Sequence, residues 1–224
     1  NGGIRGAVAG AAPGVAVIEQ ILICAVLITN NPAVPDRTAF LLGQKGARDF
    51  VPMLQQEAAE LEALGCEVLA MPCNTAHAGY NAVCGALERA QLMNMLEEAS
   101  KRAANLGCTN VGVLATNGTV SCHVYQDALE KQGLGATVPA AQEQEQVMQA
   151  IYGYVKAGRP IPDGHLERVF DTLIAAGCDG LLLGCTELTF ASPAGSYHNI
   201  PVIDALDVLA WRCVQECGAP AKEL

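Results

Sequence analysis

Short apolar runs that alternate with helical patterns constrain the fold of this chain more than any other feature of its sequence. Strand-like runs occupy Leu22–Thr29, Glu67–Met71, Val111–Ala115, Gly135–Val138, Gly180–Leu183 and Pro201–Ile203. Helical spacing of apolar residues is found in Pro52–Leu64, Leu87–Asn105, Ser121–Gln132, Glu143–Ala157, Gly164–Ala176 and Ala205–Cys217. Strands that alternate with helices are typical of βα units, in which helices cover a mainly parallel sheet. The sequence therefore predicts an α/β fold.

Two cysteine segments that resemble each other predict two similar halves. Residues 71–77 read Met-Pro-Cys-Asn-Thr-Ala-His, residues 183–188 read Leu-Gly-Cys-Thr-Glu-Leu, and each follows an apolar run. A helical segment and a Gly-Cys-acid turn, at 65–67 and at 177–179, precede each of them. This repeated plan predicts two similar α/β lobes that face one another.

The length and composition of the chain agree with two lobes. Its 224 residues allow one large domain or two lobes of about 100 residues each. The 51% of apolar residues is enough to bury a sizeable core. We expect an N-terminal lobe of residues 1–106 plus 205–224 and a C-terminal lobe of residues 107–204.

Charge, hydropathy and cysteine spacing argue against several classes of protein. The net charge of −10 and the isoelectric point near 4.8 disfavour binding to nucleic acids or anionic membranes. No run of the sequence approaches the roughly 18–20 apolar residues of a membrane helix. The ten cysteines include no Cys-x-x-Cys pair, and a chain of this length needs no disulfide scaffold. We expect no metal, no nucleic acid and no membrane insertion, and favour a soluble reducing compartment (cytoplasm, or organelle stroma or matrix).

Cys73 and Cys185 are the strongest candidates for chemistry. Ligands of open α/β sheets bind at the carboxyl ends of strands, where both cysteines are expected to lie. A cysteine there is close to a helix N-terminus, which favours its thiolate. The other cysteines lack this context and are better explained as small buried residues. The alternative, that these two also only pack in the core, remains open.

Other segments add polar groups that could bind a ligand. Arg37, on a proline-rich loop, could hold a carboxylate through two hydrogen bonds, or it could pair with Asp36. Residues 115–119, Ala-Thr-Asn-Gly-Thr, follow a strand and could cradle an anion with hydroxyls and backbone N–H groups. His77 lies one helical turn after Cys73 and is as well explained by packing as by proton transfer.

Four motifs together resemble the aspartate/glutamate racemase superfamily, and within it the aspartate racemase branch. The motifs are Asn-Asn-Pro-x-x-Pro-Asp-Arg-Thr at 30–38, Met-Pro-Cys-Asn-Thr-Ala-His at 71–77, Val-Gly-Val-Leu-Ala-Thr-Asn-Gly-Thr with a later Tyr-Gln at 111–126, and Leu-Leu-Gly-Cys-Thr-Glu-Leu at 182–188. They follow one another in the family's order, and the resemblance covers roughly residues 22–212.

The resemblance implies a fold, a reaction and a set of site residues. The fold would be two pseudo-symmetric three-layer lobes with mainly parallel sheets and the active site in the cleft between them. The reaction would be racemisation of an amino acid without a cofactor, in which Cys73 and Cys185 exchange the roles of base and acid. In the family, the positions of Arg37 and Lys156 face the side-chain carboxylate of the substrate. The substrate-binding residues would be Asn30, Arg37, Asn74, Thr75, Thr116, Gly118, Thr119, Lys156 and Thr186.

Several functions remain open at this point. The first is an aspartate racemase with an acidic amino acid as substrate. The second is a racemase-like protein recruited as a non-catalytic binding or structural component, because residues 1–21 differ from the usual first strand and helix of the family. A third is a related isomerase of the superfamily. We expect a homodimer, or a subunit of a larger assembly if recruited, and a chain that was processed or belongs to a longer one, because it begins at Asn1.

Overall fold

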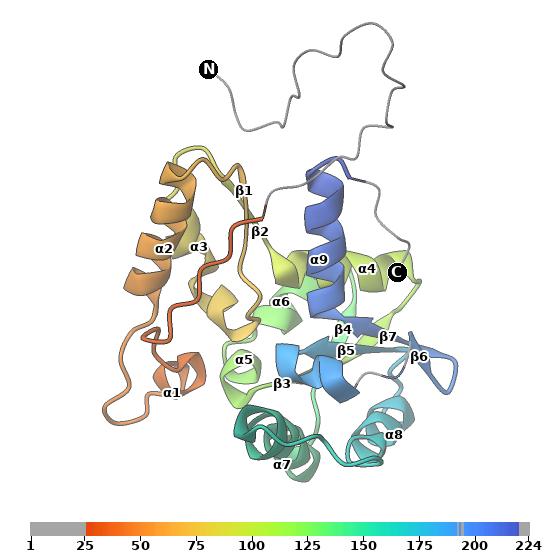
Figure 1. The fold of residues 1–224 in the computed structure, drawn as a ribbon. Helices are drawn as coiled ribbons and strands as arrows, with labels where there is room; N and C mark the ends of the chain where they lie inside the picture. Colours follow the sequence, from red (N-terminus) through yellow and green to blue (C-terminus); the bar gives the residue numbers. More distant parts are fainter. Residues whose placement is uncertain (1–25, 192, 194, 220–224) are drawn as a thin grey trace, which may run out of the picture.

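The computed structural model of the protein describes residues 26–191, 193 and 195–219. These residues form a mixed α/β fold with two sheets and mainly parallel strands, so the predicted fold class is confirmed (Figure 1). The smaller sheet pairs β1 (Val68–Ala70) with β2 (Gln91–Met93). The larger sheet has the order β4-β3-β5-β7-β6 and contains β3 (Asn110–Ala115), β4 (Gly135–Thr137), β5 (Gly180–Gly184), β6 (Ser196–Tyr197) and β7 (Ile200–Asp204).

The larger sheet is covered by helices on both faces. Helices α4 (Met95–Asn105), α6 (Val124–Glu130) and α9 (Ala205–Glu216) lie on one face, and α7 (Ala141–Met148) and α8 (Glu167–Ala175) lie on the other (Figure 1). Alternate residues of β5 divide between these layers, because side chains along a strand point to opposite faces. Leu182 packs with the first group, whereas Leu181 and Leu183 pack with the second. Both sides of this strand are fully buried, as its continuous apolar sequence predicts.

The smaller sheet packs against its own helices and forms a separate core. Leu69 of β1 lies opposite Leu92 of β2 and packs with Ala58 of α2 (Val51–Ala63) and Val83 of α3 (Tyr80–Cys84). Pro52 lies in the first turn of α2, and Gly65, with a positive φ of 95°, follows its end. Two short helices, α1 (Arg37–Leu41) and α5 (Asn117–Ser121), lie next to each other (Figure 1).

The helix expected over 87–105 is wrong in its first part, which contains β2. Asn94 separates the strand from α4, because its side-chain oxygen accepts hydrogen bonds from the N–H groups of Leu96 and Glu97 at 3.1 and 3.2 Å. Leu92 and Met93 are buried by pairing with β1. A short apolar run directly before a helix can continue the apolar periodicity of that helix, so spacing alone did not separate the strand from the helix.

Three other predicted segments differ in extent from the helices and strands of the structure. Residues 26–29 carry no strand, and residues 22–25 lie outside the described part of the chain. The helix expected over 121–132 is interrupted at His123, whose φ of 56° lies in the left-handed region and separates α5 from α6. The helix expected over 143–157 changes after Met148 into a π-helix, η2 (Gln149–Tyr154), and a 3-10 turn, η3 (Val155–Ala157).

The helices of the described residues are short. The longest, α2, has 13 residues, and α9 has 12, whereas a membrane-spanning helix needs about 20. No helix in the described part of the chain is long and apolar enough to span a membrane.

Glu62 fixes the turn that leads into β2. Its side chain is 8% exposed and accepts hydrogen bonds from the backbone N–H groups of Glu88, Arg89 and Ala90. These bonds, above all that of Ala90, lower the pKa of Glu62 below its ordinary value. A charged carboxylate is a stronger acceptor than a protonated one, so this side chain ties α2 to the start of β2 when it is ionised.

Glu62→Gln should therefore destabilise the protein at neutral pH. Because the folded pKa is lowered, the contribution of Glu62 is present above its unfolded pKa of about 4.3 and is lost as the pH falls through the folded pKa. Urea unfolding at pH 7 should give a lower free energy of unfolding for this variant than for the parent protein. This difference in free energy should shrink under acid conditions. Glu60→Gln, which changes an exposed carboxylate of the same helix, is the matched control; an equal loss there would contradict this role.

Candidate active site

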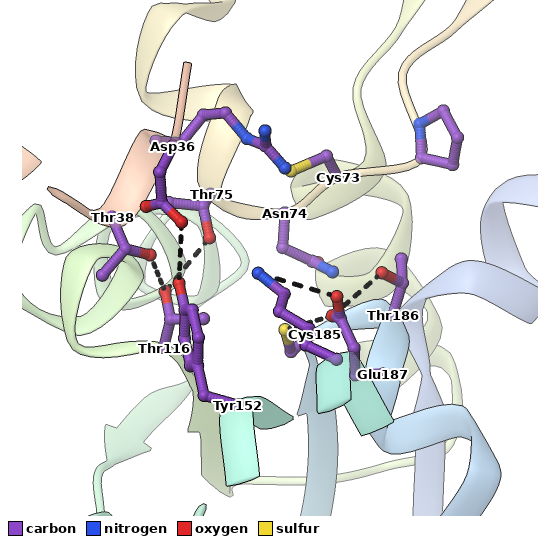
Figure 2. A pocket seen from close by; sticks show the side chains of 13 residues that line it. Asp36, Thr38, Cys73, Asn74, Thr75, Thr116, Tyr152, Cys185, Thr186 and Glu187 are labelled. Carbon is purple, nitrogen blue, oxygen red and sulfur yellow. Dashed lines mark hydrogen bonds and ion pairs between the residues drawn. The ribbon is translucent and has the colours of Figure 1, made fainter. Parts of the chain in front are cut away.

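The ends of strands from both sheets meet at one pocket. Cys73 follows β1 of the smaller sheet, and Cys185 directly follows β5 of the larger sheet. Figure 2 shows the two cysteines among the side chains that surround the opening. The lining residues are Asp36, Arg37, Thr38, Pro72, Cys73, Asn74, Thr75, Thr116, Tyr152, Lys156, Cys185, Thr186 and Glu187.

Most of the residues chosen from the sequence line this pocket, but three do not. Asn30 lies in an exposed part of the chain. Thr119 is buried behind Thr75 and Thr116, to which it is hydrogen-bonded. Gly118 packs so closely on Thr38 that an added Cβ would lie 3.0 Å from its Cα. The structure therefore gives Gly118 and Thr119 a packing position next to the pocket.

Four pocket residues of chemical interest were not chosen from the sequence. Asp36 and Thr38 flank Arg37 in the same motif, and Glu187 lies two residues after Cys185. Tyr152 lies four residues before Lys156, so the helical spacing of the two could have indicated a shared face. What spacing did not show is the π-helical turn between α7 and η3, which contains Tyr152.

A cluster of hydroxyls joins the two sheets beneath the pocket. Thr75 follows β1, whereas Thr116 and Thr119 follow β3. The Thr75 hydroxyl lies 3.1 Å from that of Thr116 and 2.9 Å from that of Thr119. Thr38 donates to Thr116 at 3.2 Å (Figure 2). All four side chains are buried, so these bonds hold the two strand ends in one fixed relation.

Asn74 presents an amide to the pocket. Its side chain is only 2% exposed, and its Oδ1 accepts a hydrogen bond from the hydroxyl of Tyr125. That bond directs Nδ2 away from Tyr125, and no partner for Nδ2 is found among the described residues. A buried donor without a partner is costly, and here it lines the pocket. Asn74 can therefore donate to an oxygen of a bound ligand.

His77 fixes the backbone of Cys73. The Met95 N–H donates to His77 Nε2 at 3.1 Å, so Nε2 is an acceptor and Nδ1 carries the proton. Nδ1 then donates to the carbonyl oxygen of Cys73 at 2.9 Å. Burial lowers the pKa of His77, although its hydrogen bonds oppose that effect. His77 is thus a neutral link between Cys73 and the start of α4.

Arg37 provides positive charge beside Cys73. It is the first residue of α1, which Asp36 caps by accepting the Ala39 N–H at 2.8 Å. Burial lowers the pKa of Arg37, but negative charge and hydrogen bonding at Cys73, and the charge of Asp36, raise it overall. The guanidinium is therefore held in its charged form in the pocket that also contains Cys73.

Cys185 lies in a different environment. Its side chain is buried, and Sγ donates a hydrogen bond to Glu187 Oε2 at 2.9 Å. Burial, followed by the charge of Glu187, raises the pKa of Cys185 well above its ordinary value. Gly184 precedes it, and a Cβ there would lie 2.7 Å from the Tyr125 ring, so only glycine fits this strand end.

Lys156 completes the charged lining of the pocket. Its Nζ lies 3.7 Å from Glu187 Oε1 and 4.2 Å from the centre of the Tyr152 ring. Burial lowers the pKa of Lys156, but Glu187, Tyr152 and Cys185 raise it overall. The pocket thus holds two cations, two thiols and an unpaired amide donor, a set suited to a small anionic ligand with acid and base groups beside it. Among the described residues, no group of three or more His, Cys, Asp or Glu is placed to hold a metal ion.

Residues 23–213 match the family model described as Asp/Glu/Hydantoin racemase. The chain belongs to this racemase family. The resemblance that the four motifs carried is thereby confirmed at the level of the family.

Solved and curated members of the family support this assignment. The aspartate racemase of Picrophilus torridus is 29% identical, with a TM-score of 0.71 over 92% of this chain and 85% of its own. RacX of Bacillus subtilis, a broad specificity amino-acid racemase, is 30% identical over 68% of this chain. A glutamate racemase of Corynebacterium kroppenstedtii is 28% identical over 64% of this chain. This chain spans 66% and 50% of the length of these two curated relatives. The two-lobe arrangement expected from the sequence is consistent with the Picrophilus torridus structure.

The neutral state of His77 predicts a pH dependence of stability. Because its folded pKa is lowered, the unfolded chain binds more protons, and the free energy of unfolding should fall as the pH drops below about 6.5. His77→Gln should remove this part of the pH dependence and, by leaving a buried group unpaired, should cost about 1–3 kcal/mol at pH 7.5. Urea unfolding across this pH range measures both effects. His198→Gln, at an exposed histidine, is the control; if it matches the His77 variant, the assignment to His77 is refuted.

Proposed function

We propose that this member of the racemase family is an aspartate racemase that needs no cofactor and transfers protons through Cys73 and Cys185. The observation that carries the proposal is that both cysteines line one pocket, from the strand ends of different sheets. Inversion at Cα without a cofactor requires a base on one face of the carbon and an acid on the other. Two thiols reaching the pocket from two sheets meet that requirement.

The proposed reaction moves one proton off Cα and another onto it. The thiolate of one cysteine takes the Cα proton and becomes a thiol, leaving the electron pair on a planar carbanion that is conjugated with the carboxylate. The thiol of the other cysteine gives its proton to the opposite face and becomes a thiolate. Fixed donors lower the energy of such a carbanion, and the free Nδ2 of Asn74 is one that lines the pocket.

The charges of the pocket support an acidic amino acid as substrate. Arg37 and Lys156 both line it and both are held in their charged forms. A substrate with a second carboxylate can pair with them, whereas alanine cannot. Similarity to the Picrophilus torridus aspartate racemase supports aspartate. Glutamate is the second candidate, because glutamate racemases are also among the similar proteins and one methylene changes specificity by only about 1–3 kcal/mol.

We also propose that the chain associates with a second copy or with other subunits. Val26, Leu27 and Ile28 are 73%, 55% and 85% exposed, and consecutive exposed apolar side chains of this kind are often covered by a partner. Light scattering coupled to size-exclusion chromatography measures the assembly. A folded assembly that exchanges no Cα hydrogen would favour the non-catalytic, recruited role over the enzyme.

Loss of either pocket cysteine should abolish racemisation. Cys73→Ser and Cys185→Ser replace a thiol by an alcohol that is far less acidic, so neither can act as the base. The measurement is the exchange of the Cα hydrogen of L- and D-aspartate in deuterated water without pyridoxal phosphate. Cys66→Ser, outside the pocket, should retain activity. Absence of exchange with aspartate and glutamate in the folded parent protein would refute the proposed enzyme.

Arg37→Ala should reduce kcat/KM for aspartate more than for alanine. Loss of a charged hydrogen bond costs about 1.5–3 kcal/mol, which corresponds to a decrease of about 10- to 100-fold. Steady-state exchange rates with both amino acids measure the difference. Equal decreases for aspartate and alanine would show that Arg37 does not recognise the second carboxylate.

A further inference from the structure

We propose that Glu187 is a positioning residue that holds the proton on Cys185, so that Cys185 is a thiol before substrate binds. This inference rests on the proposed function, and it concerns the state of Cys185 alone. Glu187 acts through Cys185 and need not contact the substrate.

The hydrogen bonds of Glu187 fix its carboxylate on the Cys185 thiol. Oε2 accepts from Cys185 Sγ at 2.9 Å and from the hydroxyl of Thr186 at 3.2 Å, and Oε1 lies 3.7 Å from Lys156 Nζ (Figure 2). Both carboxylate oxygens therefore have partners, and the acceptor that faces the sulfur is held in place from two sides. A thiol can donate to a carboxylate, but a thiolate at the same position would place two negative charges in contact.

The other charged and titratable groups near Cys185 agree with this assignment. Tyr125, from α6, and Cys73 interact with Cys185 electrostatically, and neither carries positive charge. Lys156, on η3, is the cation that interacts with it, but its nearest anion is Glu187. Burial also favours the neutral form of the Cys185 side chain, which is 7% exposed.

Cys185 therefore begins the proposed reaction as the group that gives a proton to Cα. Loss of that proton leaves a Cys185 thiolate in contact with the Glu187 carboxylate, an arrangement that places two negative charges together. Glu187 disfavours this state, so a proton must return to Cys185 before the next turnover in the same direction.

The test is the pH dependence of alkylation of each cysteine in the intact protein without substrate. Iodoacetamide reacts with thiolates, and peptide mass spectrometry gives a separate rate for Cys73 and Cys185. The shape of each pH profile, unlike the absolute rate, does not depend on how accessible the sulfur is. At pH 7.5 we expect the rate for Cys185 to remain far below its plateau.

Two variants that change the charge near Cys185 in opposite directions make the test specific. Glu187→Gln should move the Cys185 profile to lower pH and raise its rate at pH 7.5 by about tenfold or more, the change expected for one pH unit. Lys156→Met leaves Glu187 without its cation and should move the same profile to higher pH. Glu143→Gln, at a carboxylate that pairs with Arg168 outside the pocket, is the control and should leave the Cys185 profile unchanged.

A purely structural role of Glu187 predicts a different result. Loosening of the pocket would increase the exposure of Cys185 in both variants. The alkylation rate of Cys185 would then rise in both, without opposite shifts of its pH profile. Shifts in the same direction, or an unmoved Cys185 profile in Glu187→Gln, would overturn the proposal. If Glu187→Gln does not fold, the direction of the Lys156→Met shift decides by itself. Opposite shifts in a protein that racemises no amino acid would refute the proposed enzyme while leaving the role of Glu187 intact.

Discussion

The hydroxyl cluster beneath the pocket is the contact on which the site depends. Thr75 follows a strand of the smaller sheet, and Thr116 and Thr119 follow a strand of the larger sheet. Hydrogen bonds of 2.9 to 3.1 Å join these buried side chains, so the two strand ends cannot shift independently without leaving polar groups unpaired. A reaction that needs groups on two faces of one carbon requires this fixed relation, because small displacements of reacting groups are costly.

Charge placement then makes the two cysteines chemically unequal. Arg37 lies in the pocket with Cys73, whereas Glu187 accepts a hydrogen bond from the Cys185 thiol. The two segments look alike in sequence, yet Arg37 belongs to a distant loop and Glu187 to the same segment as Cys185. In the proposed reaction, the two cations that would pair with the second carboxylate of an acidic substrate also lie in the pocket with the two cysteines, so substrate binding and proton transfer would share their electrostatics.

Much of the fold and part of the site were predictable, for reasons tied to particular segments. The long apolar run of β5 and the periodic helices α2, α8 and α9 were found because each carries its pattern within itself. β2 was missed because three residues of strand cannot be distinguished by spacing from the helix that follows, and its pairing with β1 depends on distant residues. The pocket cysteines were found from local motifs. Tyr152 was missed because it lies in a π-helical segment that the spacing of apolar residues did not predict.

The sequence by itself determined the alternation of strands and helices, the two cysteine motifs at strand ends and the family to which the chain belongs. These features are local, since each is encoded in a few consecutive residues. Only the tertiary structure decided which polar groups meet. It placed Glu187 on Cys185, His77 between Cys73 and α4, and Gly118 against Thr38 rather than in the pocket. The contacts of Gly118 with Thr38 and of His77 with Met95 join distant residues through packing. The contact of Glu187 with Cys185 joins near neighbours, but the sequence does not determine the direction in which the Glu187 side chain points.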